Sequence, residues 1–297
     1  MTDRLLGSGL IILDKPAGMT SHDVISRLRR IFRTRRVGHA GTLDPMATGV
    51  LVVGIERGTR FLAHLVTETK TYRTTIRLGA STTTDDAEGD ITSRTDTTDV
   101  TDTLIDAAIA QLTGDIMQKP AAVSAIKIDG KRAHERVRDG ETVDIPARPV
   151  TVHRFDVLDR RSVDGYIDLD VDVFCSSGTY IRSLARDLGN ALGVGGHLTA
   201  LRRTTVGPFD LTHARTLEEL EDNPQLSLTL DQALAASFPV LRVSGEEGHK
   251  LAMGQWLEPR GLKEIHAAVT PDGRAVALVK EKGKRLATVF VARPSTL

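Results

Sequence analysis

Short runs and alternations of apolar residues predict the strands of this chain. Residues 10–13 and 50–55 are continuous apolar runs of strand length. Residues 70–79 and 167–173 instead alternate between apolar and polar positions, with the period of two that a half-buried strand requires. Further strands are expected between residues 142 and 160, interrupted at Pro146 and Pro149.

Helical spacing follows the first apolar run. Thr20 and Asp23 have the spacing of a capping box, so a helix is expected from about Ser21. Val24, Leu28 and Ile31 would form its apolar face. Other helices are expected over 104–112 and 179–192, and a short one within 215–234.

The pattern changes late in the chain. Residues 80–103 are rich in Thr, Ser and Asp and are expected to form a loop. After Phe238-Pro239 the chain becomes strand-and-turn, with strands expected within 240–243, 254–257, 275–279 and 287–291. The sequence therefore predicts a mixed α+β domain over residues 1–235 and a small β-rich domain over residues 236–297.

Composition indicates an ordinary globular protein. Apolar residues make up 40% and charged residues 26% of the 297 positions. No apolar stretch approaches the roughly 18 residues that a membrane span needs, and the N-terminus lacks the pattern of a signal peptide. Cys175 is the only cysteine, so an intrachain disulfide is excluded. We expect a cytoplasmic protein that does not associate with membranes.

The net charge of zero conceals an uneven distribution. Six arginines fall within residues 27–36, whereas acids dominate residues 85–106. A basic face could therefore lie opposite an acidic one, as in many proteins that bind nucleic acid. The arginines could equally form a solvated helix face. Their position just before the loop described next favours contacts with phosphates.

A single carboxylate stands in a glycine-rich loop over residues 38–49. Pro45 disfavours helical backbone at Asp44, and the glycines at 38, 41 and 49 permit tight turns. With no second acid and no cluster of metal ligands beside it, Asp44 suggests chemistry by one carboxylate. The structural alternative is an Asp-Pro turn that leads into a buried strand.

Three aspartates alternate with the apolar residues of 167–173. Asp168, Asp170 and Asp172 share one face of the predicted strand, which raises the question of a metal site. Neither His nor Cys completes a ligand set, so a solvated face opposite a buried one is the preferred interpretation.

The loop of residues 38–49 also resembles the active-site loop of the TruB family of tRNA pseudouridine synthases, in which Asp44 takes the position of the essential aspartate. Residues 175–189 resemble the family segment whose arginine pairs with that aspartate, and Arg182 is the matching position. Lys70-Thr71-Tyr72-Arg73 is similar to the strand whose tyrosine stacks on the target base. These blocks occur in the family's order over nearly all of residues 9–210.

The resemblance implies further site residues. His39 matches a histidine placed against the extruded bases, and Leu201 an apolar residue that covers the base pocket. Asp86 matches a carboxylate near the arginine, Lys15 belongs to a segment packed near the site, and Tyr180 precedes the arginine. Each also has a structural interpretation as a core, cap or surface residue. The sequence departs from the family at Thr83 and Asp85, which affects the details around Asp86.

The implied reaction is isomerisation of the T-loop uridine at tRNA position 55 to pseudouridine, through an aspartate nucleophile and base flipping, without a cofactor. The partner would be the T arm of tRNA, the enzyme would act as a monomer without an obligatory protein partner, and the C-terminal segment would be a PUA-like RNA-binding module. Three alternatives stay open: an RNA-guided synthase in a multi-protein particle, an RNA chaperone, and a hydrolase that releases free uracil. The hydrolase would typically use two carboxylates.

Overall fold

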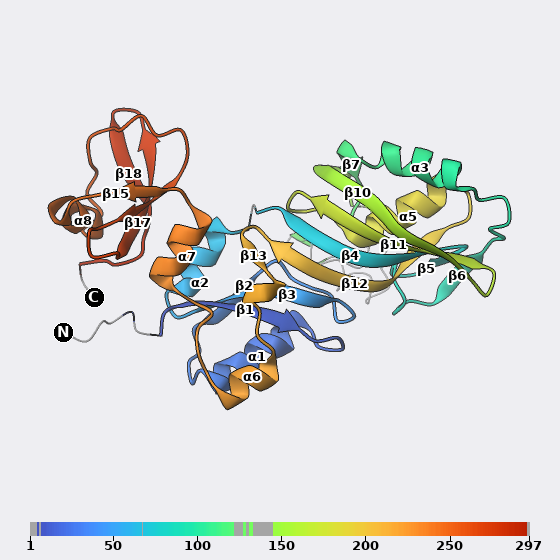
Figure 1. The fold of residues 1–297 in the computed structure, drawn as a ribbon, viewed down its shortest axis with the longest axis horizontal. Helices are drawn as coiled ribbons and strands as arrows, with labels where there is room; N and C mark the ends of the chain where they lie inside the picture. The colour runs from blue at the N-terminus through green and yellow to red at the C-terminus, as the bar shows by residue number, and fades with distance from the viewer. Residues whose placement is uncertain are drawn as a thin grey trace. The chain divides into compact units, whose positions relative to one another are not determined.

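The computed structural model describes residues 5, 7–66, 68–121, 127–128, 131–132 and 145–295. The chain divides into two compact units (Figure 1). Unit 1 comprises residues 1–66 and 205–297, and unit 2 comprises residues 67–204. The predicted domain boundary near residue 236 stays a prediction.

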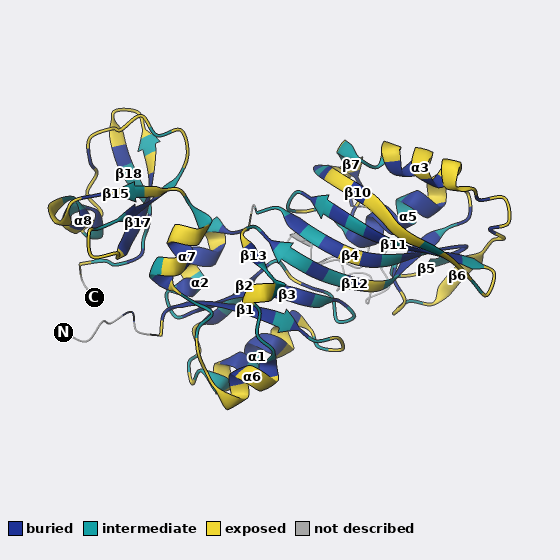
Figure 2. Ribbon diagram, viewed as in Figure 1, coloured by how far each residue is buried: buried dark blue, intermediate teal, exposed yellow. Residues whose placement is uncertain are grey.

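Unit 1 is built around the two continuous apolar runs. Strands β1 and β3 pair antiparallel from Gly9 opposite Ile55 to Lys15 opposite Gly49, and they are almost completely buried (Figure 2). The elements of this unit are β1 (Gly9–Lys15), α1 (Ser21–Ile31), β2 (Val37–Ala40), β3 (Thr48–Ile55), α2 (Gly58–Phe61), η1 (Leu62–His64), β13 (Phe209–Asp210), η2 (Leu211–His213), α6 (Leu217–Asp222), β14 (Leu228–Thr229), α7 (Leu230–Ser237), β15 (Val240–Arg242), α8 (Gly245–Ala252), β16 (His266–Val269), β17 (Ala275–Lys282) and β18 (Arg285–Val291).

Helix α1 begins as its sequence predicts. The Thr20 side chain accepts a hydrogen bond from Asp23 N at 3.0 Å, and the Asp23 carboxylate accepts one from Thr20 N at 2.9 Å. Val24, Ile25 and Leu28 are buried. The capping box and the apolar face are therefore confirmed, and together they direct this helix onto the sheet.

The small C-terminal sheet has the order β15-β16-β17-β18, with β15 and β16 parallel and the other pairs antiparallel. One apolar cluster includes residues of β1 and β3 as well as Ala267, Leu278 and Phe290 of this sheet. Polar contacts join the same parts, because Asp231 on α7 accepts hydrogen bonds from Ala275 N at 2.8 Å and from the Arg293 guanidinium at 2.6 Å. The C-terminal sheet thus shares a core with the N-terminal strands of unit 1.

Two features of this segment differ from the expectation. Residues 254–257 are not a strand, apart from a single bridge between Leu257 and Leu286. Helix α8 was not expected, although its cap is readable: Ser244 and Glu247 form a capping box at its start.

Unit 2 is a twisted sheet with the strand order β12-β4-β11-β10-β7, and α5 packs against β4 and β5. Its elements are β4 (Lys70–Leu78), β5 (Ala80–Thr82), β6 (Ile91–Arg94), α3 (Asp102–Gln111), β7 (Gly114–Gln118), β8 (Lys127–Ile128), β9 (Lys131–Arg132), β10 (Arg148–Val163), β11 (Tyr166–Cys175), α5 (Ile181–Ala191) and β12 (Gly196–Val206). The helices expected over 104–112 and 179–192 are α3 and α5. The predicted loop of 80–103 contains the β5–β6 hairpin.

The prolines do not divide β10. The strand begins at Arg148 and continues through Pro149, which lies opposite Met117 of β7. At Pro149 the strand pairs with β7 alone, because its pairing with β11 begins at Val152, and a position with one unpaired side tolerates proline. The expectation of interrupted strands was therefore wrong for the described part, while residues 142–144 lie outside it.

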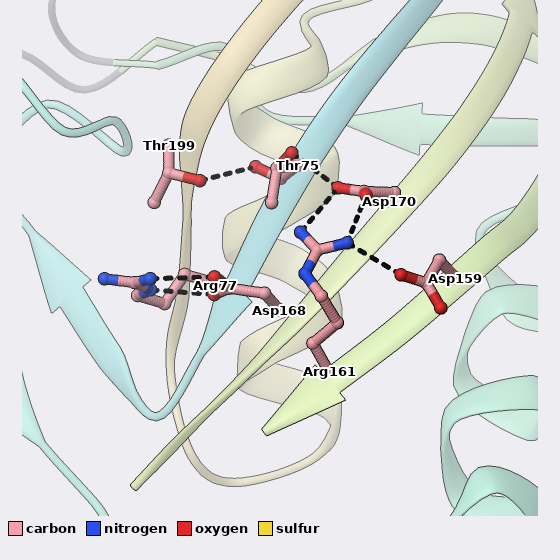
Figure 3. Close-up of polar contacts among 7 residues, drawn as sticks. All are labelled: Thr75, Arg77, Asp159, Arg161, Asp168, Asp170 and Thr199. Carbon is pink, nitrogen blue, oxygen red and sulfur yellow. Dashed lines mark hydrogen bonds and ion pairs between the residues drawn. The ribbon is translucent and has the colours of Figure 1, made fainter. Parts of the chain in front are cut away.

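The three aspartates of β11 do not form a solvated face. Asp168 is only 5% exposed and receives two hydrogen bonds of 2.7 Å from the Arg77 guanidinium (Figure 3). Asp170 binds Arg161 and accepts a hydrogen bond of 2.6 Å from Thr75, and Asp172 binds the Arg154 guanidinium at 2.5 Å. Neighbouring strands β4 and β10 supply the arginines, so the residue pattern of β11 alone did not reveal the pairing.

Candidate active site

The loop that carries Asp44 is anchored immediately before the aspartate. Ser21, at the first position of α1, donates its hydroxyl to Leu43 O and accepts from Leu43 N, both at 3.0 Å. Ser21 and Leu43 are buried, whereas Asp44 is half-buried. The residue before Asp44 is therefore held through both of its backbone polar groups, and Asp44 is partly accessible to solvent.

Lys15 anchors the loop on the other side of Asp44. Its side chain is fully buried, and Nζ donates to Pro45 O at 3.2 Å, to Ala47 O at 2.8 Å and to Pro16 O at 2.8 Å. Gly18 N adds a hydrogen bond of 2.9 Å to Pro45 O. Because three carbonyls engage the three donors of the ammonium group, the geometry supports a positioning role for Lys15.

His39 lies on β2, opposite Val53 of β3, and is half-buried. The chain uses glycine with positive φ at Gly41, just after β2, and at Gly49, near the start of β3, with φ angles of 74° and 97°. Other residue types rarely adopt these angles, so the loop needs glycine at both positions. Unit 1 thus carries Lys15 at the end of β1, His39 on β2 and Asp44 in the loop between β2 and β3.

In unit 2, Tyr72 lies on the buried face of β4. It is 7% exposed and stands opposite Val173 of β11. Lys70 shares this face and is 8% exposed; burial, followed by the charge of Arg203, lowers the pKa of Lys70 to about 8. Leu201, 8% exposed, lies on the neighbouring strand β12.

Arg182 and Asp86 form a buried charged pair. Arg182, in the first turn of α5, is 6% exposed, and Asp86 is 2% exposed. The Arg182 Nη1 atom lies 3.4 Å from Asp86 Oδ2 and donates to Thr84 O at 3.1 Å. Asp86 also accepts hydrogen bonds from Thr84 Oγ1 at 2.5 Å and Glu88 N at 3.0 Å. The ion pair with Asp86 and the hydrogen bond to Thr84 O orient the Arg182 guanidinium.

The departure from the family at Asp85 has a local partner. Asp85 has a φ of 61°, which non-glycine residues rarely adopt, and its carboxylate lies 3.3 Å from the Arg186 Nη1 atom. Burial raises the pKa of Asp85, and the nearby guanidiniums of Arg186 and Arg182 oppose this effect. The second departure, Thr83, accepts a hydrogen bond from Asp90 N at 3.2 Å. Both departures therefore lie in the turn that presents Asp86 to Arg182.

Tyr180 supplies the backbone at the start of α5, and Gln118 holds it there. The Gln118 side chain accepts from Tyr180 N at 2.8 Å and donates to Tyr180 O at 3.0 Å, and it is 1% exposed. Gln118 comes from the end of β7 and lies 62 positions from Tyr180, so nothing in the local sequence indicated this role.

Two other residues that hold or adjoin the site were not predicted as site residues. Ser21 could have been noticed at the predicted start of α1, and Lys70 from its alternation with Tyr72.

The arginines of residues 27–36 are not equivalent. Arg27 is engaged by Glu221 on α6, with hydrogen bonds of 2.6 Å and 2.8 Å, so its charge is largely matched. Arg29, Arg30, Arg33, Arg35 and Arg36 are exposed. The later members of the run therefore leave positive charge exposed, but Arg33 and Arg36 lie near Ile55, at the end of β3 opposite to Gly49 and the Asp44 loop.

The chain matches family models along most of its length. Residues 29–181 match the N-terminal domain of the TruB family pseudouridylate synthases, residues 182–236 match the C-terminal domain of tRNA pseudouridylate synthase B, and residues 238–293 match the C-terminal domain of tRNA pseudouridine synthase II. The chain therefore belongs to the TruB family of pseudouridine synthases, which are isomerases. The predicted family and enzyme class are confirmed.

Individual relatives agree with this family assignment. The chain is 72% identical over 297 residues to tRNA pseudouridine synthase B of Corynebacterium efficiens, with complete coverage of both chains. It is 58% identical to tRNA pseudouridine synthase B of Nocardia farcinica, over 97% of this chain and 94% of the relative.

Solved structures confirm the fold class. A Cbf5-Nop10-Gar1 complex matches with a TM-score of 0.74 and 27% identity, over 98% of this chain and 87% of that chain. An H/ACA RNP bound to a substrate RNA containing 2'-deoxyuridine matches with a TM-score of 0.72 and 25% identity, over 96% and 85%. The mixed-sheet α+β fold with a separate small C-terminal sheet is that of a pseudouridine synthase. Among the described residues, no helix has the length and apolar character to cross a membrane.

Proposed function

We propose that this chain is a stand-alone tRNA pseudouridine synthase that converts the T-loop uridine at tRNA position 55 to pseudouridine, with Asp44 as the nucleophile. The observation that carries the proposal is the anchoring of the Asp44 loop on both sides, by Ser21 and by Lys15. A half-buried carboxylate on an immobilised loop is suited to nucleophilic catalysis.

Three residues carry the chemistry in this proposal. The reaction breaks the N-glycosidic bond, turns the uracil and rejoins it through C5, so that the product is an isomer of the substrate. Asp44 attacks either uracil C6 or ribose C1′, and Arg182 stabilises its ionised form as a cationic partner. Tyr72 stacks on the base and assists removal of the C5 proton to solvent. N1 takes up a proton from solvent and the bond to Asp44 breaks, so that atoms balance and the enzyme is regenerated. No redox step occurs, and no cofactor is required.

The uridine must leave the folded T loop to reach these groups. Flipping a base costs a few kcal/mol, which stacking on Tyr72 and contacts to the RNA backbone would offset. His39 would lie against the extruded bases, and Leu201 would cover the base pocket. Asp86 would orient Arg182, and Tyr180 would hold the start of its helix at the base pocket. The substrate is recognised mainly through the shape of the T arm.

The comparisons favour tRNA over a guided substrate. The relatives named tRNA pseudouridine synthase B share up to 72% identity with this chain over its full length, whereas the matching chains of Cbf5 and H/ACA complexes share 25–27%. We therefore propose that the protein acts as a monomer, without an obligatory protein partner, in the cytoplasm where tRNA is matured.

The test uses an unmodified tRNA transcript that carries tritium at uridine C5, incubated with the protein without added metal or cofactor. We expect tritium release and pseudouridine in the T loop with the native protein, and neither with Asp44→Asn, which retains the fold and binds tRNA. Substantial release by Asp44→Asn would refute the assignment of the nucleophile. Binding without release by the native protein would favour the RNA-chaperone alternative, and free uracil would favour the hydrolase.

Arg182→Ala separates catalysis from binding. Because Arg182 is buried against Asp86, we expect a severe fall in kcat with a much smaller change in tRNA affinity. A defect in affinity alone would reassign Arg182 to the binding of the RNA backbone. Arg182→Lys is the matched variant, since it retains the charge without the planar fork.

A further inference from the structure

A pocket of about 400 Å³ lies in unit 1, at the end of β1 and β3 where Gly9 pairs with Ile55, opposite to the end that adjoins the Asp44 loop. Its walls come from the segment between α1 and β2, the turn after β3 and the residues that precede β1. Its charged lining residues are Arg33, Arg36, Glu56 and Arg57. Three guanidiniums therefore face one carboxylate.

That carboxylate is already engaged. Glu56 accepts a short hydrogen bond from Thr34 Oγ1, and its other oxygen lies 3.4 Å from the Arg36 Nη1 atom. Among the described residues, Arg33 makes no side-chain hydrogen bond or ion pair. Glu56 thus balances Arg36, and the charges of Arg33 and Arg57 remain.

Arg57 is held by neutral groups only. Its Nε atom donates to Ala292 O at 2.8 Å and its Nη2 atom to Val291 O at 2.5 Å, so its contacts within the described residues include no carboxylate. Burial, and then repulsion from Arg60, lower its pKa. A half-buried guanidinium that two carbonyls orient, and that no anion neutralises, is a binding site for an anion.

The backbone at this pocket is unusual as well. Four non-glycine residues in the described chain have positive φ, and two of them, Arg33 at 51° and Glu56 at 52°, line the pocket. Such conformations cost energy and tend to be retained where function requires them. Here they place the Arg33 side chain beside the turn that carries Arg57.

We propose that this pocket binds a backbone phosphate of the substrate RNA, through Arg33 and Arg57. The proposal rests on the proposed function for the choice of RNA. Guanidiniums bind phosphate oxygens in a fork geometry. Exposed Arg29, Arg30, Arg35 and Arg60 surround the pocket residues in sequence, so positive charge extends beyond what a single small anion would neutralise. A polyanion such as RNA would neutralise the pocket charges and these surrounding charges together.

The test measures tRNA affinity over a range of salt concentrations for the full-length protein. Each phosphate contact that is lost should reduce the slope of log K against log[salt] by about 0.7–0.9, or about fivefold in affinity near 0.1 M salt. We expect this loss for Arg33→Ala and for Arg57→Gln, which retains an amide donor for the carbonyls. The charge-preserving Arg33→Lys and Arg57→Lys should keep most of the slope. Arg94→Gln removes one exposed cation of unit 2 and serves as the control for net charge.

A second arm distinguishes RNA from free phosphate. Inorganic phosphate is compared with chloride at equal ionic strength, and Tm is recorded for the native protein and Arg57→Gln. If phosphate raises Tm through Arg57 while the salt slope is unchanged, the pocket takes a small anion and the RNA contact is refuted. Slopes for Arg33→Ala and Arg57→Gln equal to that of Arg94→Gln likewise overturn it.

Failure of the proposed function gives a different result. A native protein that binds tRNA but releases no tritium contradicts the catalytic proposal alone, and the slopes still decide the phosphate contact. A native protein that does not bind tRNA refutes both.

Discussion

Replacement of Lys15 by methionine tests whether the Asp44 loop depends on its buried anchor. The ammonium group is fully buried and donates to three carbonyls at 2.8–3.2 Å. Hydrogen bonds that involve a charged group contribute about 1.5–3 kcal/mol each, so the three bonds sum to about 4.5–9 kcal/mol. Removal of a buried charge returns several kcal/mol of desolvation free energy. We therefore expect Lys15→Met to lower the free energy of unfolding by about 3 kcal/mol.

Lys15→Met should reduce the catalytic rate more than it weakens substrate binding. The carbonyls of Pro45 and Ala47 follow Asp44 directly in the chain, and a displacement of the carboxylate by about 1 Å can cost about 100-fold in rate. We expect kcat to drop by at least tenfold, with a smaller effect on KM. Urea unfolding followed by circular dichroism measures the stability, and tritium release measures the rate.

Two further variants make the result interpretable. Ser21→Ala removes the anchor on the other side of Asp44 and should also lower kcat, with a loss of about 1 kcal/mol in stability. Lys250→Met removes a half-exposed lysine that pairs with Glu246, and it should change stability by less than about 0.5 kcal/mol. If Lys15→Met matches Lys250→Met in both urea midpoint and kcat, the anchoring argument is refuted.

Three other predictions concern unit 2. Burial lowers the pKa of Lys70 from 10.5 to about 8, so between these pH values the unfolded chain binds more protons than the folded chain. The free energy of unfolding should therefore rise with pH by about 3 kcal/mol. Lys70→Met should lack this rise in urea titrations at pH 7.5 and 10. Asp168→Asn should destabilise the protein by about 2 kcal/mol, because it removes the negative charge and one of the two acceptors for the Arg77 guanidinium in a mostly buried pair; an unchanged Tm would contradict this. Gln118→Leu should leave Tyr180 N and O without their Gln118 partners, which costs about 2 kcal/mol in stability and lowers kcat. Gln118→Glu should keep the hydrogen bond from Tyr180 N. Equal turnover of the two variants would count against the role of Gln118 in holding the start of α5.

The sequence predicted a helix or strand correctly where its capping residues and its apolar periodicity agreed. The capping box of Thr20 and Asp23 and the apolar positions after it predicted α1. The same kind of box at Ser244 and Glu247 was overlooked, because the surrounding residues read as strand and turn. A strand was wrongly predicted at 254–257, because four residues are too few for their pattern to distinguish a strand from a loop with one bridge.

The sequence by itself determined the family, the α+β class and the position of Asp44 in a glycine-rich loop, because glycine and proline restrict the backbone locally and motif order survives in one dimension. Tertiary structure alone decided which groups hold these residues. Lys15 reaches Ala47 over 32 positions, Arg182 reaches Thr84 over 98, and the aspartates of β11 find arginines on two other strands. These contacts join segments that only the folded chain brings together, so no local pattern encodes them.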